Sequence, residues 1–553
     1  MGADYIFNLP SKSVSRKITA MNSNKLQRLP VGIQDFRKIR GDGYLYLDKT
    51  EYIYNLIQSG EIYFLSRPRR FGKTLLVSTL ECLFKCEREL FQGLWIEDNW
   101  DWDKSWPVIR LDMSSILIKT AEEVSSKIIN RIKGIAQMHG ISQINETDHA
   151  EAFRSLIQLL SQKHNKKVVV LIDEYDSPII SNLNDIDKAK AIREEIRDFY
   201  RVLKSEEASL RFIFLTGVSK FSRAGVFSAL NNLNDISIDE RFAIMLGITQ
   251  PELEDYFSSY ITKLSTKEGV SKEAILEKIR FWYNGFCFDG ANGATEKNTV
   301  YNPFSTLLLF DKNNFQNYWF ESGSPKFLLD LLKQNEYNVP EIEYMRIDSD
   351  AFNSYEPDDL RIEALLFQTG YITIKDKESS DIYILSYPNY EVKRSFLRAV
   401  LDTLESINRG RSGTYIYDMK QDLKADPPEF EAFIEKFKAF FAKIPYDIHD
   451  RIKEKEQYYQ SIIYAVLAML GLEVRGEVRV AKGRIDLMFE LNQRAFIIEC
   501  KLNASADDAI EQIKKQGYAN AYRGKTQKTY LIGISLDTQE RNISDYKWEL
   551  LSE

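Results

Sequence analysis

The chain has 553 residues, enough for three or four domains at the common domain size of roughly 150 residues. Hydrophobic residues make up 44% and charged residues 28%, which excludes a largely disordered or collagen-like protein. With 74 Lys and Arg against 81 Asp and Glu, the net charge of -7 excludes a uniformly basic nucleic-acid binder, although not a local basic groove.

The sequence offers no membrane span and no secretion signal. Its longest apolar runs, such as residues 168–172, are only long enough for a strand, so we expect no transmembrane helix and no membrane partner. Four cysteines exclude a disulfide scaffold, and no apolar segment follows the basic residues near the start, as it would in a signal peptide. We therefore expect a protein of the reducing cytoplasm.

The first two segments differ in their hydrophobic pattern. Residues 1–28 are polar, weakly basic and aperiodic, which predicts a loose tail. From residue 29 to about 290, short apolar runs alternate with amphipathic segments, and strands separated by helices predict a mostly parallel sheet with helices on both faces. The expected strands include residues 63–66, 108–112, 168–173 and 212–216.

A Gly-Lys-Thr sequence, Gly72 to Thr74, follows the first of these strands and precedes a helical run. This is the context of a phosphate-binding loop (P-loop), whose backbone N–H groups and helix N-terminus face phosphates. Lys73 would reach the β and γ oxygens, and the Thr74 hydroxyl would bind Mg²⁺. Arg67 stands where the first glycine of such a loop is usual. The residues predicted to contact the nucleotide here are Arg70, Phe71, Gly72, Lys73, Thr74 and Leu75.

A second motif supports the first. Residues 168–172 form a continuous apolar run, as a buried central strand should, and the run ends in Asp173 and Glu174. Asp173 would hold Mg²⁺ through its coordination shell, and Glu174 would polarise the attacking water. The alternative for each motif alone is a chance match in a solvated turn, but both occur in the expected order and spacing.

The next predicted strand ends in Thr216, which could sense the γ-phosphate from a neighbouring position in the sheet. Arg223 and Arg241 are candidates for an arginine that stabilises the transition state, from this chain or from a neighbouring subunit of a homo-oligomer. The alternative for both arginines is an ordinary surface position.

Residues 291–429 have another pattern. A helix, a hairpin and a second helix are compatible with a winged-helix unit, but we favour a small packing or lid domain because no basic cluster marks a recognition helix. The expected elements are a helix over 358–370, strands over 371–374 and 382–386, and a helix from 390 to about 406. Asp426-Pro427-Pro428 marks the linker to a last domain.

The last domain contains a predicted β-hairpin. Two apolar-rich runs, 483–491 and 494–501, flank the turn residues Asn492 and Gln493. With that turn, Asp486 and Glu499 lie directly opposite each other on one face, with side chains about 5 Å apart. Two opposed carboxylates repel, so a purely structural hairpin should avoid them.

A divalent cation between the two carboxylates removes this conflict, and oxygen ligands suit Mg²⁺ or Mn²⁺. Lys501 shares their face because it lies two residues beyond Glu499, and it could activate water or stabilise charge on a phosphate. The alternative is an exposed edge hairpin that carries ordinary charges.

Two helical segments flank this hairpin. The first begins at Glu456, a candidate third metal ligand or, alternatively, a favourable charge near a helix N-terminus. The second runs over 505–522 and carries Gln512, which could contact the substrate or its waters or could be a plain surface residue.

Both sites together resemble bacterial and archaeal proteins that join an N-terminal AAA-ATPase-like domain to a C-terminal nuclease-like domain of the PD-(D/E)xK superfamily. The resemblance covers about residues 29–543 and keeps the order and spacing of motifs across two unrelated domains. The stretches that carry it are 29–36, 66–74, 171–179, 216–222, 301–305, 483–487 and 497–501.

The resemblance implies ATP binding by the Gly72–Thr74 motif, with Asp173 and Glu174 on Mg²⁺ and water. It also implies a restriction-endonuclease-like fold whose active triad is Asp486, Glu499 and Lys501, with Glu456 as a further metal ligand. The variant loop around Arg67 looks like the family's own.

We therefore expect an α/β protein with a tail over 1–28, a P-loop AAA-like ATPase domain over 29–290, a helical, winged-helix-like region over 291–429 and a nuclease-like domain over 430–553. The expected function is metal-dependent cleavage of DNA gated by ATP, with homo-oligomer formation left open. The alternatives are a nucleotide-dependent switch or scaffold that binds nucleic acid or a partner without cleaving, and an ATPase with an appended structural domain.

Overall fold

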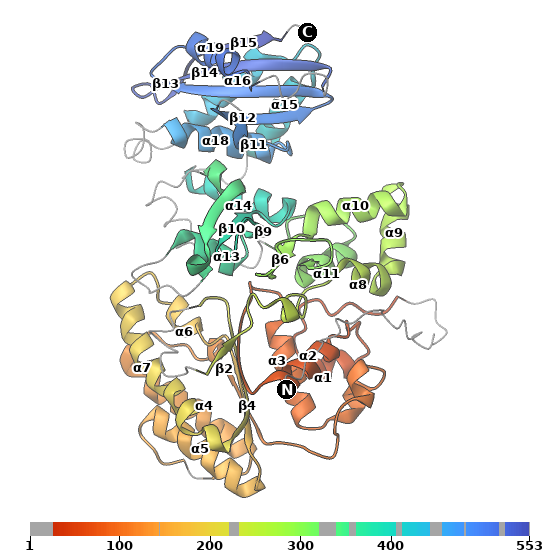
Figure 1. The fold of residues 1–553 in the computed structure, drawn as a ribbon, viewed down its shortest axis with the longest axis vertical. Helices are drawn as coiled ribbons and strands as arrows, with labels where there is room; N and C mark the ends of the chain where they lie inside the picture. The colour runs from red at the N-terminus through yellow and green to blue at the C-terminus, as the bar shows by residue number, and fades with distance from the viewer. Residues whose placement is uncertain are drawn as a thin grey trace, which may run out of the picture.

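The computed structural model describes residues 26–142, 144–220, 232–319, 339–352, 361–404, 412–442, 456–480, 483–518 and 526–551. Figure 1 shows a parallel sheet at one end of the molecule, a second five-stranded sheet at the other end, and a small three-stranded sheet with helices between them. Most of the expected tail lies outside the described residues. Among the described residues, no helix combines the length and the apolar character needed to cross a membrane.

The first sheet has the strand order β2-β3-β4-β1-β5, and every pairing in it is parallel. Its strands are β1 (Ile62–Ser66), β2 (Val108–Asp112), β3 (Val168–Asp173), β4 (Leu210–Gly217) and β5 (Asn234–Asp235). Parallel strands place their carboxyl ends at one edge, so the residues that follow β1, β3 and β4 come together there.

Helices cover both faces of this sheet, as predicted (Figure 1). One face carries α4 (Ala121–Met138), α5 (His149–His164) and α7 (Ile186–Ser205), and the other carries α1 (Phe36–Gly41), α2 (Thr50–Ser59) and α3 (Lys73–Phe84). Along β3, Val170 and Ile172 belong to the hydrophobic cluster that includes residues of α4, α5 and α7. Val169 and Leu171 belong to the cluster that includes residues of α1, α2 and α3. The apolar run of β3 is therefore that of a strand buried on both faces.

Four helices follow the sheet and share one hydrophobic core that includes Phe257, Tyr283 and Phe310. They are α8 (Gln250–Tyr256), α9 (Ser258–Glu268), α10 (Lys272–Tyr283) and α11 (Pro303–Lys312). The short strands β6 (Phe286–Cys287) and β7 (Thr299–Val300) pair between α10 and α11. The boundary expected at residue 290 falls within this packed unit and stays a prediction.

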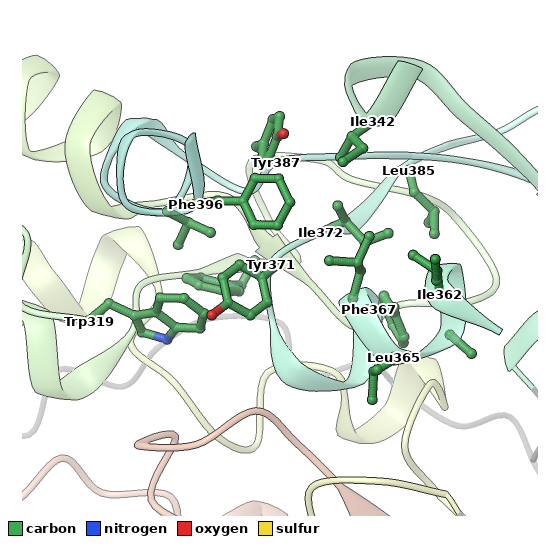
Figure 2. Close-up of a cluster of buried hydrophobic side chains, with 14 of the residues drawn as sticks. Trp319, Ile342, Ile362, Leu365, Phe367, Tyr371, Ile372, Leu385, Tyr387 and Phe396 are labelled. Atoms are coloured by element: carbon green, nitrogen blue, oxygen red, sulfur yellow. The ribbon is translucent and has the colours of Figure 1, made fainter. Parts of the chain in front are cut away.

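The middle region has the expected helix, hairpin and helix: α13 (Ile362–Thr369), β9 (Thr373–Lys377), β10 (Ile382–Ser386) and α14 (Tyr390–Leu404). A third strand, β8 (Met345–Asp348), completes an antiparallel sheet of order β8-β10-β9. Figure 2 shows the core of this region, where the Tyr371 ring lies 4.9 Å from Trp319 and 5.3 Å from Phe396.

The C-terminal sheet has the order β11-β12-β13-β14-β15 and is antiparallel except for the parallel pair β13–β14. Its strands are β11 (Arg475–Val480), β12 (Gly483–Leu491), β13 (Arg494–Leu502), β14 (Lys528–Asp537) and β15 (Asn542–Leu550). The helix α19 (Ala506–Gln516) connects the parallel pair, while α16 (Phe430–Phe441) contacts β15 and α18 (Glu456–Met469) contacts β12 and β13.

The hairpin turn is as predicted. Asn492 and Gln493 both have left-handed backbone angles, with φ of 52° and 60°, which is the geometry of a two-residue type I′ turn. The register runs from Leu491 opposite Arg494 to Leu487 opposite Ile498. This register is the one on which the predicted juxtaposition of the two carboxylates depends.

The segment just before the linker packs onto the C-terminal sheet through one buried cation. The Arg494 guanidinium donates hydrogen bonds to the carbonyl oxygens of Leu423, Lys424 and Ala425, at 2.6–3.1 Å. These carbonyls lie at and just after the end of α15 (Ser412–Lys424). A single hydrophobic cluster also includes Val170 of β3, Leu385 of β10 and Ile498 of β13, so the three parts share a continuous apolar core.

Candidate nucleotide and nuclease sites

The loop between β1 and α3 has the backbone of a phosphate cradle. Gly72 has a φ of 90°, and the space where a Cβ would stand is open, with no heavy atom within 4 Å. Lys73 is buried, and its Nζ donates to the carbonyl oxygens of Arg67 (2.8 Å) and Pro68 (3.0 Å). The lysine thus rests on carbonyls of its own loop, and phosphate oxygens would offer its ammonium charged acceptors instead.

The other residues predicted to contact the nucleotide here differ in their burial and packing. The Phe71 ring packs against Phe286 and Phe288, with ring centroids 4.9 and 5.3 Å away, so only its backbone is available to a phosphate. The exposed Arg70 guanidinium lies 4.6 Å above the Phe304 ring. Thr74 is half-buried in the first turn of α3, and Leu75 packs against the α1–α3 core.

Thr216 and Asp173 form a contact beside this loop. The Thr216 hydroxyl donates to Asp173 Oδ1 at 2.7 Å, and both side chains are buried. Strand β4 lies between β1 and β3, so Thr216 stands between the phosphate loop and the acidic end of β3. The predicted grouping of Lys73, Asp173 and Thr216 is therefore present in space.

Glu174 follows Asp173 with a φ of 49°, a left-handed conformation that is uncommon for a residue other than glycine. Burial raises the pKa of Glu174, while the neighbouring Lys73 opposes that rise. Burial also lowers the pKa of Lys73, against the charges of Glu174, Asp173 and Asp176. A carboxylate of raised basicity next to the loop is suited to accept a proton.

Arg67, the departure from the usual loop sequence, is explained by its surroundings. Its side chain is 1% exposed and donates to the carbonyl oxygens of Ser66 (3.0 Å), Ser237 and Phe242 (3.3 Å). Its guanidinium lies 4.2 Å above the Phe288 ring. The side chain is therefore a structural tie between β1 and the segment after β5.

Sequence reasoning missed Asp176. This carboxylate is 1% exposed and accepts hydrogen bonds from the backbone N–H of Val218 (3.1 Å) and from both the N–H (2.6 Å) and the hydroxyl (2.5 Å) of Ser219. It fixes the exit of β4 next to Thr216. The signal was its position three residues after Asp173, at the end of the Asp-Glu-Tyr-Asp run.

The two arginine candidates gain no support. Arg241 is half-exposed and pairs with Asp239 at 2.6 Å. Arg223 lies outside the described residues. A role for either in the transition state stays a prediction.

In the C-terminal domain, Glu499 is the centre of the second site. Its side chain is fully buried, and Oε1 accepts hydrogen bonds from Lys501 Nζ (3.1 Å) and from Gln512 Nε2. Within the described part of the chain, Oε2 has no hydrogen-bond partner. Burial, followed by the nearby Asp486 charge, raises the pKa of Glu499 to about 8.

Asp486 lies where the paired part of the hairpin ends. Its Oδ2 accepts the backbone N–H of Cys500 at 2.8 Å, so the carboxylate takes a strand donor near Glu499. Lys501 is part-buried, which by itself would lower its pKa, but the charges of Glu499, Glu456 and Asp486 raise it. Asp486, Glu499, Lys501 and Gln512 are thus gathered as predicted.

Glu456 lies close to this group but has its own partners. Its Oε2 accepts the Leu502 N–H at 3.1 Å, and its Oε1 accepts from Gln460 at 3.2 Å. Across the described residues, no three His, Cys, Asp or Glu side chains form a ready metal-binding group. The role of Glu456 as a third metal ligand stays a prediction.

The donors at this site nevertheless suit a hard divalent cation. Glu499 Oε2 is a buried carboxylate oxygen that lacks a hydrogen-bond partner among the described residues, and the Asp486 charge beside it is unfavourable. Mg²⁺ commonly binds proteins through one or two carboxylates and keeps several waters. Asp486 and Glu499 supply that minimum.

The comparisons with known proteins agree with this architecture. Residues 30–227 match the family described as "Predicted AAA-ATPase", and residues 454–546 match the "PD-(D/E)XK nuclease superfamily". An "uncharacterized protein in vnfD 5'region" of Azotobacter chroococcum mcd 1 is 38% identical over 535 residues, which cover 95% of this chain and 99% of the relative.

The chain belongs to this family of predicted AAA-ATPases with a PD-(D/E)XK domain. Among solved structures, "Structure of the Aeropyrum Pernix ORC2 protein (ADPNP-ADP complexes)" is 12% identical and covers 64% of this chain and 93% of its own, with a TM-score of 0.24. A TM-score that low does not define a common fold.

The ATPase part of this family member contacts the middle region directly at its phosphate loop. A Cβ built on Gly370, at the end of α13, would stand 2.7 Å from Pro68 Cβ, so loop and helix touch. The Cys287 N–H donates to the Thr373 hydroxyl at 2.7 Å, and the Lys220 N–H donates to Gln368 at 2.9 Å.

The middle region in turn contacts the nuclease-superfamily part. The Val339 N–H donates to the Ser461 hydroxyl of α18 at 3.2 Å. Lys393 of α14 pairs with Glu343 and donates to the Val474 carbonyl at 3.2 Å. Because α18 begins at Glu456, a chain of packed elements joins the phosphate loop to the surroundings of the second site.

Proposed function

We propose that this protein binds and hydrolyses ATP with Mg²⁺ and that its nucleotide state controls metal-dependent hydrolysis of DNA in the cytoplasm. The observation that carries the proposal is the clustering of Asp486, Glu499, Lys501 and Gln512 on one hairpin and helix, in a chain that also carries the Gly72–Thr74 motif of a phosphate-binding loop.

At the nucleotide site, the loop backbone and Lys73 would hold the phosphates, and Thr74 and Asp173 would hold Mg²⁺. Glu174 would accept a proton from the attacking water, because burial raises its affinity for protons. Thr216 orients the Asp173 carboxylate through its hydroxyl.

At the second site, Asp486 and Glu499 would hold Mg²⁺ or Mn²⁺, which when bound neutralises the paired charges and makes water a better nucleophile. Lys501 would stabilise charge that develops on the phosphate, since its raised pKa keeps it an ammonium. Gln512 holds the Glu499 carboxylate from α19 and so fixes its orientation.

Control by ATP would travel through the middle region. Phosphate binding would draw Lys73 from the carbonyls of Arg67 and Pro68, and Pro68 rests on Gly370. Coupling between distant sites commonly amounts to 5- to 150-fold. We expect cleavage to change by about tenfold or more when ATP is added.

The test is cleavage of plasmid and single-stranded DNA with Mg²⁺ or Mn²⁺, with and without ATP. Asp486→Ala should abolish cleavage, and Lys73→Ala should abolish ATP turnover and the response of cleavage to ATP. Asp507→Ala, an exposed acid of the same domain, and Lys85→Ala, just after α3, are matched controls that should retain both activities.

The second candidate is a nucleotide-dependent switch whose nuclease-like domain binds without cleaving. The observation that favours it is that Asp486 Oδ2 and Glu499 Oε1 already hold protein donors. No cleavage in any nucleotide or metal state, with ATP turnover intact, would sink the first proposal and support this one.

A further inference from the structure

A cavity of about 430 Å³ lies where the three parts of the chain meet. Residues of α10, β10, α14, α18 and β11 line it, and none of the residues assigned above to either site does so. Its volume falls in the usual range of ligand-binding clefts, about 300–1,000 Å³.

The lining carries more cations than acids: Lys375, Lys393, Arg394 and Arg475 against Glu343 and Glu473. Lys393 is neutralised by Glu343, and Lys375 donates to the Pro388 carbonyl at 3.0 Å. Arg394 and Arg475 have no carboxylate partner within the described ranges, so their charges are available to an anion. Guanidinium groups bind phosphates by paired hydrogen bonds.

Aromatic rings stand beside these arginines. Tyr344 is 77% exposed and Phe281 is 46% exposed, and both line the cavity. The Phe281 ring is stacked on Tyr390 with centroids 4.9 Å apart, and the Arg394 guanidinium lies 6.0 Å from the Tyr390 ring. Exposed rings interleaved with free arginines are the pattern of surfaces that bind single-stranded nucleic acid, by stacking on bases and pairing with phosphates.

We propose that this cleft binds a single-stranded segment of nucleic acid, with Arg394 and Arg475 on the backbone and Tyr344 or Phe281 under a base. The proposal deepens the function proposed above by naming the form of its substrate. A base-paired duplex would fit less well, because its bases are already stacked and cannot reach the rings.

The position of Arg475 connects the cleft with the nuclease hairpin. Arg475 begins β11 and pairs with Met488 of β12, two residues from Asp486. Two residues along a strand correspond to about 7 Å. A nucleic-acid strand bound by Arg475 would therefore pass close to the Asp486–Glu499 pair.

The experiment measures binding of a fluorescent 20-nucleotide oligo-dT to the full-length protein by anisotropy. It uses Asp486→Ala protein in chelator, so that failure of cleavage cannot be mistaken for failure of binding. We expect tight binding of oligo-dT, weaker binding of a duplex of equal length, and much weaker binding of the dinucleotide pTpT.

Two further variants, made in the same background, test the two contact types. Tyr344→Ala should weaken oligo-dT binding about fivefold or more, from the loss of one stacked base. The double variant Arg394→Gln with Arg475→Gln should weaken it further and lower the salt dependence, with the slope of log K against log salt falling by about 1.4. Arg201→Gln, a half-exposed arginine on α7, is the matched control and should bind like the parent.

The proposal is overturned if the parent does not bind oligo-dT, or if both variants bind it as the parent does. Equal affinity for duplex would also overturn it, since base stacking would then play no part. Equal affinity for pTpT would assign the cleft to a small nucleotide ligand instead. Circular dichroism and ATP turnover of each variant distinguish lost contacts from a misfolded chain.

Discussion

The buried lysines and carboxylates of the two candidate sites have different partners. At the nucleotide site, Lys73 lies among several carboxylates but hydrogen-bonds to backbone carbonyls, and Asp173 is held by the neutral Thr216 hydroxyl. At the nuclease-like site, Lys501 pairs directly with Glu499, whose pKa remains raised by burial and Asp486.

This difference indicates which charge each site would stabilise. The lysine of the nucleotide site is held by weak, neutral acceptors, so an incoming phosphate can displace them. The second site carries more negative charge than its lysine offsets, so a cation should stabilise it. The charges of the first site therefore favour an anion, and those of the second favour a cation.

The largest expected effect concerns Arg67, the tie beneath the nucleotide site. Arg67→Gly, which restores the usual glycine, should destabilise the ATPase part by about 2–6 kcal/mol relative to Arg69→Gly. The reason is that the carbonyls of Ser237 and Phe242 lose a buried donor, at about 1–3 kcal/mol each. Urea unfolding followed by fluorescence is suitable, because Trp95, Trp100, Trp102 and Trp106 all lie in this part. Equal stability of the two variants would contradict the structural role.

A buried acid outside both sites gives a reference for the raised pKa of Glu499. Burial raises the pKa of Glu391 to about 7, although the N–H groups of Tyr318 and Trp319 donate to it. The folded state therefore holds this proton more tightly than the unfolded state. The contribution of Glu391 to stability is therefore full below about pH 4.5 and is lost as pH rises through about 7.

Glu391→Gln should remove this part of the pH dependence. We expect the parent to lose up to about 3 kcal/mol relative to the variant between pH 4.5 and 7.5. Urea midpoints at several pH values measure the difference. A difference between the two proteins that does not change with pH would show that Glu391 stays ionised.

Variants of Thr216 test whether its neutral hydroxyl is needed to hold the Asp173 carboxylate at the nucleotide site. Thr216→Val removes a hydrogen bond to a carboxylate, worth about 1.5–3 kcal/mol, so kcat for ATP hydrolysis should fall about 10- to 100-fold. Thr216→Ser keeps the hydroxyl and should retain most activity. Steady-state phosphate release would reveal the pattern, and equal losses in both variants would argue against the hydrogen bond.

The smallest effect concerns the excess charge at the second site. Asp486→Asn removes the neighbour that raises the pKa of Glu499 and can still accept the Cys500 N–H. We expect it to be as stable as the parent, or more stable by up to about 1 kcal/mol, in chelator at pH 7. Added Mn²⁺ should raise the melting temperature of the parent more than that of the variant. A clear loss of stability in chelator would contradict this account.

The sequence predicted local geometry best. The two-residue turn at Asn492 and Gln493 fixes the hairpin register, and the register alone places Asp486 near Glu499. The nucleotide site could be predicted from motifs alone. The motifs follow strands of one parallel sheet, and the carboxyl ends of parallel strands lie at the same edge whatever the strand order. Nothing in the motifs themselves placed β4 between β1 and β3.

Features that depend on distant partners were not predicted. The buried role of Arg67 requires the carbonyls of Ser237 and Phe242, about 170 residues away in the chain. The cleft takes Arg394 from α14 and Arg475 from β11, so no basic cluster stands out in the sequence. Strand β8 has four residues, and among the described residues it pairs with β10 alone, which is five residues long.

The buried Arg494 guanidinium bears on how this protein can be divided. Its acceptors are the carbonyls of residues 423–425, which precede Asp426 and the proline pair at 427–428 and lie ahead of the domain start expected at residue 430. A fragment that began at residue 430 would lack all three acceptors, and the Arg494 guanidinium would lose its hydrogen bonds to the end of α15. A C-terminal fragment that is to fold by itself should therefore begin before α15.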